Sequence, residues 1–325
     1  ALGESELVDA LGTKPYFVHG QELFHETSPS NTMGVGYLGA SLTNIGDVFL
    51  IPLKYRLGKN VKRIHRNVEK VVAEIDILSS LSHCNILPFL KATNDGHFDE
   101  GFLVFASVDW KVSKPFARHS ETELSRLNFH QILQILGQIC DVLAYLHGKN
   151  VTHGLLSSHS VLFNQERCNV TVCRYEKRIV VSNRHELVSD ADDLKGWLAP
   201  EVLVLDHFTP SCDVFSFGVF MWYLLTLKNP FEKDSAMSVN RKVVNDEARP
   251  PITLKDMKKL EAYKRELYDK ETGLTYVDLI HQCWAQKIEK RMKLADAVRV
   301  LKEFEDLVKA RDESKEASQR IATMV

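Results

Sequence analysis

The chain has 325 residues, of which 44% are hydrophobic and 26% charged, and its formal net charge at pH 7 is −2. A chain of this size can bury a substantial core, and its nearly balanced charge excludes the one-signed surface field typical of proteins that bind nucleic acids or membrane surfaces. The six cysteines form no C-x-x-C pair, which favours reduced thiols in the cytoplasm. The longest apolar run, residues 214–227, is too short to span a bilayer and is typical of a buried helix.

Strands separated by glycine turns are predicted near the start of the chain. Residues 1–20 are polar, and we expect an irregular lead-in there, whereas residues 31–57 alternate apolar segments with glycine turns and predict strands. This region contains a G-x-G-x-x-G sequence at Gly34, Gly36 and Gly39. Because such a sequence also occurs in hairpin turns, it needs support from its neighbours.

A helix is predicted over residues 66–81, because apolar residues recur there on one helical face: Val68, Val71, Val72, Ile75 and Leu78. Glu74 lies beside this face, twenty residues after Lys54. Residues 101–108 are apolar and predict a further strand.

The second half of the chain is mainly helical by its periodicity. Residues 129–147 carry apolar residues at helical spacing, and residues 213–227 predict a buried central helix. A last amphipathic helix is predicted over residues 298–308. The polar tail, residues 311–325, is expected to be loose.

Between the first two of these helices, residues 151–163 have the order His153-Gly-Leu-Leu156, with Ser160 four residues later. This order is similar to the His-Arg-Asp-Leu-x-x-x-Asn catalytic loop of protein kinases. Other landmarks stand in that family's order along the chain: the three glycines, Lys54, Glu74, Trp197-Leu-Ala-Pro-Glu201, Asp213-Val-Phe-Ser-Phe-Gly218, and Cys283-Trp284 with Arg291. Together they resemble the protein-kinase superfamily over residues 20–307, with details that lean toward tyrosine kinases and their tyrosine-kinase-like relatives.

The resemblance implies an α+β, bilobal fold with a small, mainly β lobe and a larger, mainly α lobe. The implied organisation is a lead-in at residues 1–20, a kinase-like domain at 21–310 and a polar tail at 311–325. Within the domain, the resemblance places the small lobe at residues 21–107 and the large lobe at 108–310.

Three positions that carry the family's chemistry hold unsuitable residues here. Leu155 replaces the catalytic Asp, and a leucine neither accepts a proton nor ligates a metal. Ser160 replaces the magnesium-binding Asn, and a serine hydroxyl is a weak neutral ligand. Arg174 replaces the Asp of Asp-Phe-Gly, and a guanidinium has only donors and repels Mg²⁺. We therefore expect no catalytic residues, no metal site and no enzymatic activity: the chain resembles a pseudokinase.

Nucleotide binding is a separate question, because some residues favour it and others oppose it. Gly34, Gly36 and Gly39 would let backbone N–H groups approach phosphates, and Lys54 and Glu74 would form the family's ion pair beside them. These five residues are the candidate nucleotide site. We expect no cofactor, and any ATP binding is expected to be independent of metal.

Bulk and charge stand against nucleotide binding. Pro52 and Phe105 are large at positions that the family places near the adenine. Arg174 is also expected near Glu74, where it either pairs with that carboxylate or points to solvent.

Some residues have structural roles by the same resemblance. Asp213 is expected to accept hydrogen bonds from the backbone of the catalytic loop. Glu201 is expected to pair with Arg291 within the large lobe.

Three functions are compatible with these features. The leading prediction is a catalytically inactive pseudokinase that acts as an allosteric or scaffolding protein-interaction module in signalling. The first alternative is a nucleotide sensor that binds ATP weakly, without Mg²⁺ and without phosphoryl transfer. The second alternative is an atypical active kinase with relocated metal ligands, for which Glu176 and Asp192 are the nearest acids.

By analogy with the family, the expected partner is a protein, either an active kinase or another domain of the same polypeptide. Residue 1 is alanine rather than methionine, which suggests a fragment. No nucleic-acid partner and no membrane span are expected, and the expected location is the cytoplasm. The final residues, Thr323-Met324-Val325, match a PDZ-ligand pattern that also arises by accident.

Overall fold

The computed structural model describes the chain in several stretches: residues 17–19, 38–42, 46–54, 72–73, 75–94, 100–106, 113–173, 194–205, 207–253, 256 and 273–324. These residues divide into two compact units near Arg118, and Leu162–Gln165 and residues 171–173 belong to the first of them. The first unit holds a five-stranded sheet and the second is mainly helical. The predicted α+β class is therefore confirmed.

The sheet of the first unit has the strand order β1-β4-β5-β3-β2. Its strands are β1 (Phe17–His19), β2 (Leu38–Leu42), β3 (Gly46–Lys54), β4 (Phe89–Asn94) and β5 (Glu100–Ala106). β1 pairs with β4 in parallel, and the other neighbours are antiparallel. The side chains of Val48, Leu103, Val104 and Phe105 form a buried core on this sheet, as expected for strands rich in β-branched and aromatic residues.

Strand β1 corrects one prediction. The lead-in at residues 1–20 was expected to be irregular, but Phe17–His19 form a strand whose partners are Ala92, Thr93 and Asn94 of β4. Three residues are too few to show a period of two in the sequence, so pairing with an existing edge strand decides their conformation.

The helix predicted over residues 66–81 is described at residues 72–73 and 75–80. Ile75 and Leu78 are buried, three residues apart on one face, as predicted. The segment after the helix is tied to a second sheet, because the Leu87 amide donates to the Val172 carbonyl (3.1 Å) and the Val172 amide donates to the Asn85 carbonyl (2.7 Å).

This second sheet has three strands in the order β6 (Ser113–Pro115), β7 (Val161–Asn164) and β8 (Asn169–Val172). Phe116, in the short helix η2 (Phe116–Arg118), stacks on Phe163 of β7 with ring centroids 4.7 Å apart.

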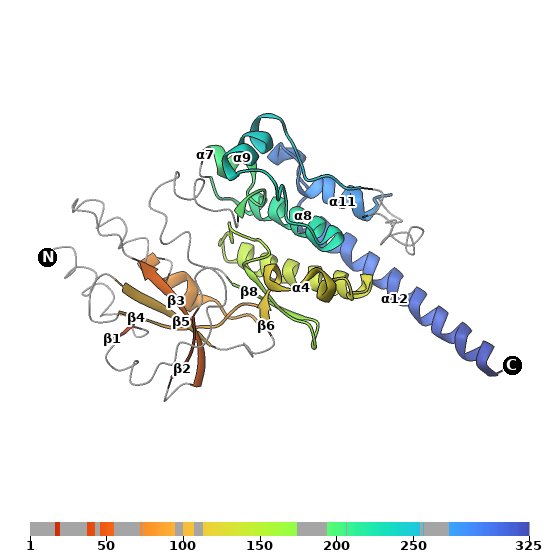
Figure 1. Cartoon of the computed structure of the whole chain (residues 1–325), viewed down its shortest axis with the longest axis horizontal. Helices are drawn as coiled ribbons and strands as arrows, with labels where there is room; N and C mark the ends of the chain where they lie inside the picture. The colour runs from red at the N-terminus through yellow and green to blue at the C-terminus, as the bar shows by residue number, and fades with distance from the viewer. Residues whose placement is uncertain are drawn as a thin grey trace. The chain divides into compact units, whose positions relative to one another are not determined.

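The second unit is built around a buried helix (Figure 1). All residues of α8 (Pro210–Thr226) from Cys212 onward are buried, so its sequence shows an apolar run rather than an amphipathic stripe. The other described helices of this unit are α3 (Glu121–Leu124), α4 (Phe129–Gly148), α7 (Pro200–Leu205), α9 (Ala236–Asn245), α11 (Tyr276–Cys283), η4 (Ile288–Lys290) and α12 (Leu294–Met324). The predicted helices over 129–147 and 213–227 are confirmed.

Helix α12 corrects a second prediction. The sequence suggested a helix over residues 298–308 followed by a loose tail, whereas α12 runs without interruption to Met324 (Figure 1). Residues 309–324 contain no Gly or Pro and are rich in Ala, Glu, Lys and Arg, which favour helix although they are polar. Val325, on which the predicted PDZ-type terminus depends, lies outside the described residues.

All six cysteines lie in the described part of the chain and none forms a disulfide. Cys84 is exposed, Cys168 is half-buried, and the other four are buried. Over the described residues, no helix is both long enough and apolar enough to cross a bilayer.

Two helical glycines test the packing of the second unit. A Cβ on Gly218 of α8 would lie 2.8 Å from Cys283 Cβ and 3.1 Å from the Trp284 nitrogen, whereas a Cβ on Gly137 of α4 would have no neighbour within 4 Å. We expect Gly218→Ala to lower the free energy of unfolding by about 1–3 kcal/mol through overpacking. Gly137→Ala, the matched control, should raise it by about 0.5–1 kcal/mol, measured by urea unfolding of both variants. Equal effects of the two variants would contradict this packing.

Candidate functional site

The loop with kinase-like spacing is held in shape by one buried carboxylate. Asp213 of α8 is fully buried and accepts hydrogen bonds from the His153 amide (2.9 Å) and the Gly154 amide (2.6 Å). His147, near the end of α4, places its Nε2 2.8 Å from the same carboxylate. Gly154 has a φ of 79°, a conformation that favours glycine because it lacks a Cβ. The predicted role of Asp213 is confirmed.

The position that would need an acid is buried and apolar. The Leu155 side chain is only 7% exposed, and Leu156 is fully buried. The Leu155 amide donates to His153 Nδ1 (3.3 Å), so the backbone is ordered around a buried imidazole. A leucine in this setting provides packing and neither a proton acceptor nor a metal ligand.

The position that would need a metal ligand is used inside the loop. Ser160 is 2% exposed, and its Oγ accepts from the Ser157 amide (2.9 Å) and donates to the Ser157 carbonyl (3.1 Å). Its hydroxyl therefore closes a local turn. Among the described residues, no group of three or more His, Cys, Asp or Glu side chains could hold a metal ion.

The candidate nucleotide residues are only partly described. Gly39 lies in β2 opposite Phe49 of β3, and Lys54 is the last residue of β3, opposite Glu100. Gly34, Gly36, Glu74 and Arg174 lie outside the described residues. The grouping of these five residues therefore stays a prediction, and the pairing of Arg174 with Glu74 stays a hypothesis.

The two bulky residues expected near the adenine lie in the central strands. Pro52 of β3 is opposite Phe102 of β5, beyond the last β3 residue that pairs with β2, Leu50. This placement suits a residue that has no amide proton. Phe105 is buried and packs edge-on against Phe89 with ring centroids 5.5 Å apart.

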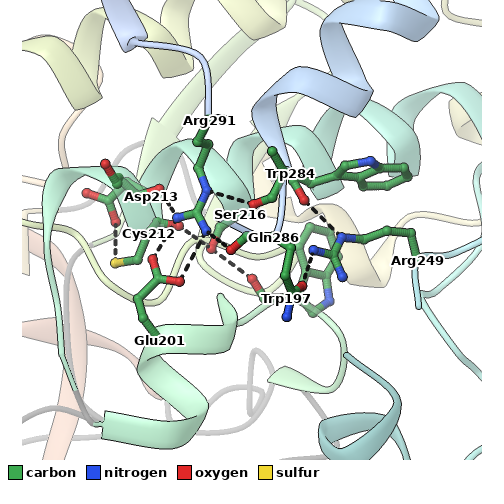
Figure 2. A network of polar contacts seen from close by, with 11 residues as sticks. Trp197, Glu201, Cys212, Asp213, Ser216, Arg249, Trp284, Gln286 and Arg291 are labelled. Atoms are coloured by element: carbon green, nitrogen blue, oxygen red, sulfur yellow. Dashed lines mark hydrogen bonds and ion pairs between the residues drawn. The ribbon is translucent and has the colours of Figure 1, made fainter. Parts of the chain in front are cut away.

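A buried ion pair links two segments of the helical unit (Figure 2). Arg291 donates to both oxygens of Glu201, at 2.6 and 3.1 Å, and both residues are buried. The same guanidinium donates to the carbonyls of Ser211 (2.8 Å) and Ala285 (3.1 Å). The predicted pair of Glu201 with Arg291 is confirmed, and it joins α7 to the segment before α12.

A second arginine, which the sequence analysis missed, lies beside this pair (Figure 2). Arg249 donates to the Trp284 carbonyl (2.9 Å) and to Gln286 Oε1 (2.7 Å). Both guanidiniums lie over the Phe215 ring, with Cζ 4.8 Å from the centroid for Arg249 and 5.3 Å for Arg291. Burial, and then the positive charge of Arg291, lower the pKa of Arg249 to about 10.

The segment before α7 is also fastened to the helical unit. Trp197 is buried, and its carbonyl accepts from Ser216 Oγ of α8 (2.8 Å). Lys195 donates to the carbonyls of Glu232 (3.1 Å) and Asp234 (2.8 Å). Residues 194–199 are thus held between α8 and the loop before α9.

The loop anchor gives a direct test. In Asp213→Asn the amide group has one acceptor oxygen for three donors, so we expect the free energy of unfolding to fall by about 1–3 kcal/mol because buried donors lose their partner. The control is Asp234→Asn, which breaks a partly exposed pair with Lys242 (2.7 Å) and should cost less than about 1 kcal/mol. Chemical denaturation of both variants decides; an equally small loss in Asp213→Asn would contradict the anchoring role.

Comparison with known proteins gives a family. Residues 57–301 match the family described as protein tyrosine and serine/threonine kinase. The chain is 25% identical over 239 residues to the serine/threonine/tyrosine-protein kinase HT1 of Arabidopsis thaliana, covering 73% of this chain and 55% of that protein. It is 24% identical over 257 residues to the tyrosine kinase receptor Cad96Ca of Drosophila melanogaster, covering 75% of this chain and 31% of that protein.

The chain thus spans about half, or less, of the length of these two relatives. The match to the kinase family covers most of the chain. The α+β architecture, with a small β unit and a larger helical unit, agrees with that family. The chain belongs to the protein kinase superfamily, among the tyrosine kinases and their tyrosine-kinase-like relatives.

Proposed function

We propose that this chain is a catalytically inactive kinase-family module that acts through protein interactions in signalling. The observation that carries the proposal is the state of the loop: Leu155 is buried and apolar, and the Ser160 hydroxyl is bound to Ser157. Phosphoryl transfer depends on metal ions at the phosphates and on an oriented nucleophile, and these two side chains supply neither.

The sequence supports the same conclusion at a third position. Arg174 stands where the family has its second magnesium ligand, and a guanidinium is a donor-only cation. Restoring metal binding would require an acid from elsewhere in the chain. Glu176 and Asp192 are the nearest in sequence, and they define the competing proposal of an atypical active kinase.

Buried polar groups that shape the loop and fasten the helical unit are kept beside the replaced catalytic positions. Asp213 retains its two backbone donors, and Glu201 retains its bidentate partner. A fold that keeps these buried polar contacts presents a defined surface, whose conformation a partner or a modification can bias. We propose that the partner is an active kinase or another domain of a longer polypeptide, in the cytoplasm.

Nucleotide sensing is the second proposal. Lys54 is placed at the end of a well-paired strand, and Gly39 lies in the neighbouring strand. In a chain without metal ligands, ATP would bind weakly and without Mg²⁺, through the lysine and backbone amides.

One experiment separates these proposals. We expect no transfer of radiolabel from ATP to the protein itself or to a generic peptide, with or without Mg²⁺, while an active kinase labels the peptide in parallel. We also expect no Mg²⁺-dependent rise of the thermal midpoint with ATP. Transfer that disappears in Lys54→Ala would establish the atypical active kinase. A midpoint shift that Lys54→Ala removes, without product, would establish the sensor.

The buried environment of position 155 gives a further prediction. Leu155→Asp would put the family's acid back into an apolar site, and we expect it to lower the free energy of unfolding by about 2–4 kcal/mol at neutral pH. The loss should shrink at acidic pH, because a protonated carboxyl has no charge to desolvate. Leu155→Met, the control of similar volume, should cost less than about 1.5 kcal/mol. Urea unfolding at two pH values checks this, and an unchanged stability in Leu155→Asp would show that the site is open to water.

A further inference from the structure

The first strand of the chain is paired at the sheet edge opposite to that of the next strand in sequence. β1 (Phe17–His19) lies at one end of the strand order β1-β4-β5-β3-β2, and β2 lies at the other end. Within the described sheet, the single strand neighbour of β1 is β4, with which it pairs in parallel. β1 is therefore held at the outer edge of β4 by this pairing and not by a hairpin to β2.

The pairing of β1 with β4 is short. β1 contributes three residues, which lie opposite Ala92, Thr93 and Asn94. Parallel pairing is slightly less stable per residue than antiparallel pairing. The few hydrogen bonds that three residues can form stabilise the pair by an amount similar to the entropy cost of ordering those residues. We therefore expect β1 to leave the edge readily while the other four strands stay folded.

β4 is held in place from its other side. It pairs with β5 along Phe89–Asn94, and the Ala106 amide at the end of β5 donates to the Pro88 carbonyl just before β4 (2.9 Å). Phe89 packs edge-on against the buried Phe105 of β5, with ring centroids 5.5 Å apart. The edge that β1 covers is thus preformed, so β4 loses little conformational entropy when a strand binds there.

The register defines what a strand needs in order to fit this edge. Ala92 is 1% exposed, and on its other side it pairs with the buried Leu103 of β5. Directly paired positions share a face of the sheet, so the position opposite Ala92 lies on the face that packs in the core. An apolar residue is expected at this position, and in β1 it is Phe17.

We propose that the outer edge of β4 at Ala92–Asn94, here called the β4 edge, is a strand-addition site for an extended segment of a partner protein, and that β1 is its intramolecular competitor. The partner segment runs parallel to β4, carries a large apolar side chain opposite Ala92 and has no proline at the three paired positions. β1 supports this choice of occupant, because it shows the direction and the register that the edge accepts. This inference deepens the proposed interaction role and rests on it.

Competition with β1 sets the affinity for the partner. β1 belongs to the same chain as β4, so it competes at a high effective concentration. The apparent affinity of a partner falls in proportion to the fraction of molecules in which the edge is open. Any change that detaches β1 therefore strengthens partner binding, and the first strand regulates access to the β4 edge.

Two prolines in β1 test whether the strand is detachable. Successive amides of a strand point to opposite sides, so in Phe17→Pro/Val18→Pro one proline removes an amide that faces β4. By hydrogen exchange with mass spectrometry, we expect the protection of residues 92–94 to fall about tenfold, while β3 and β5 stay protected and the thermal midpoint changes by less than about 3 °C. Ser41→Pro/Leu42→Pro on β2, at the opposite edge, should leave exchange at residues 92–94 unchanged.

A peptide added in trans tests the site itself. The probe is a fluorescent peptide with the sequence of residues 14–21 of this chain. By anisotropy, we expect it to bind Phe17→Pro/Val18→Pro about tenfold more tightly than the unmodified chain, in which β1 occupies the edge. The same peptide with Phe17→Asp should bind about tenfold more weakly, because its carboxylate would lie on the core face opposite Ala92. The peptide that carries both prolines should not bind.

Four results would overturn the proposal: equal affinity of the probe for the two chains, binding of the proline peptide, no binding to the variant chain, or a fall of the variant's thermal midpoint by more than about 10 °C. Sedimentation that reveals a dimer of the unmodified chain, absent in Phe17→Pro/Val18→Pro, would replace the partner by a second copy that exchanges β1. The phosphoryl-transfer assay keeps the two proposals distinguishable. Activity in the unmodified chain would refute catalytic inactivity, whereas failed peptide binding in an inactive chain would refute only the β4 edge.

Discussion

The structure of the loop depends on the buried Asp213 carboxylate, which accepts hydrogen bonds from two backbone amides and contacts a histidine nitrogen. A buried carboxylate is costly unless its lone pairs are used, and here the donors come from the loop that needs to be shaped. The anchor acts on the main-chain amides of His153 and Gly154, and the Ser160 hydroxyl adds contacts to the Ser157 backbone. The buried Leu155 takes no part in these hydrogen bonds through its side chain.

The buried polar side chains of the helical unit hold its helices and loops in place. Buried polar contacts stabilise the helices of this unit against one another. Arg291 binds Glu201 of α7 and the Ser211 carbonyl of α8, next to the buried Asp213. Phe215 contributes by lying under the two guanidiniums of Arg249 and Arg291, and its ring face offsets part of their mutual repulsion. In this chain these contacts join α7, the start of α8 and the segment before α12.

The sequence predicts those parts of the fold and of the site in which a residue's role follows from periodicity or from a motif. Helix α4 was predicted from its apolar spacing and α8 from its apolar run. The roles of Asp213 and of the pair of Glu201 with Arg291 were predicted from their motifs. Arg249 was missed because its acceptors, the Trp284 carbonyl and Gln286, lie more than thirty residues away and form no motif. Polar residues of α12 were misread as a loose tail, since polarity reports exposure and not conformation. The exposure of Leu205 and Met237 depends on which helix face meets the core, which composition alone does not reveal.

The distribution of thiols has a practical consequence. Burial raises the pKa of Cys283 to about 12 and also raises the pKa values of Cys140 and Cys168, which keeps these sulfurs protonated and poorly nucleophilic. Cys84 alone among the six is exposed, in the turn between the helical residues 75–80 and β4. A maleimide dye should therefore attach selectively at this turn without prior mutagenesis, two residues from the strand bridge between Ile86 and Val172. Its emission would then report on the junction between the helical residues 75–80 and the three-stranded sheet.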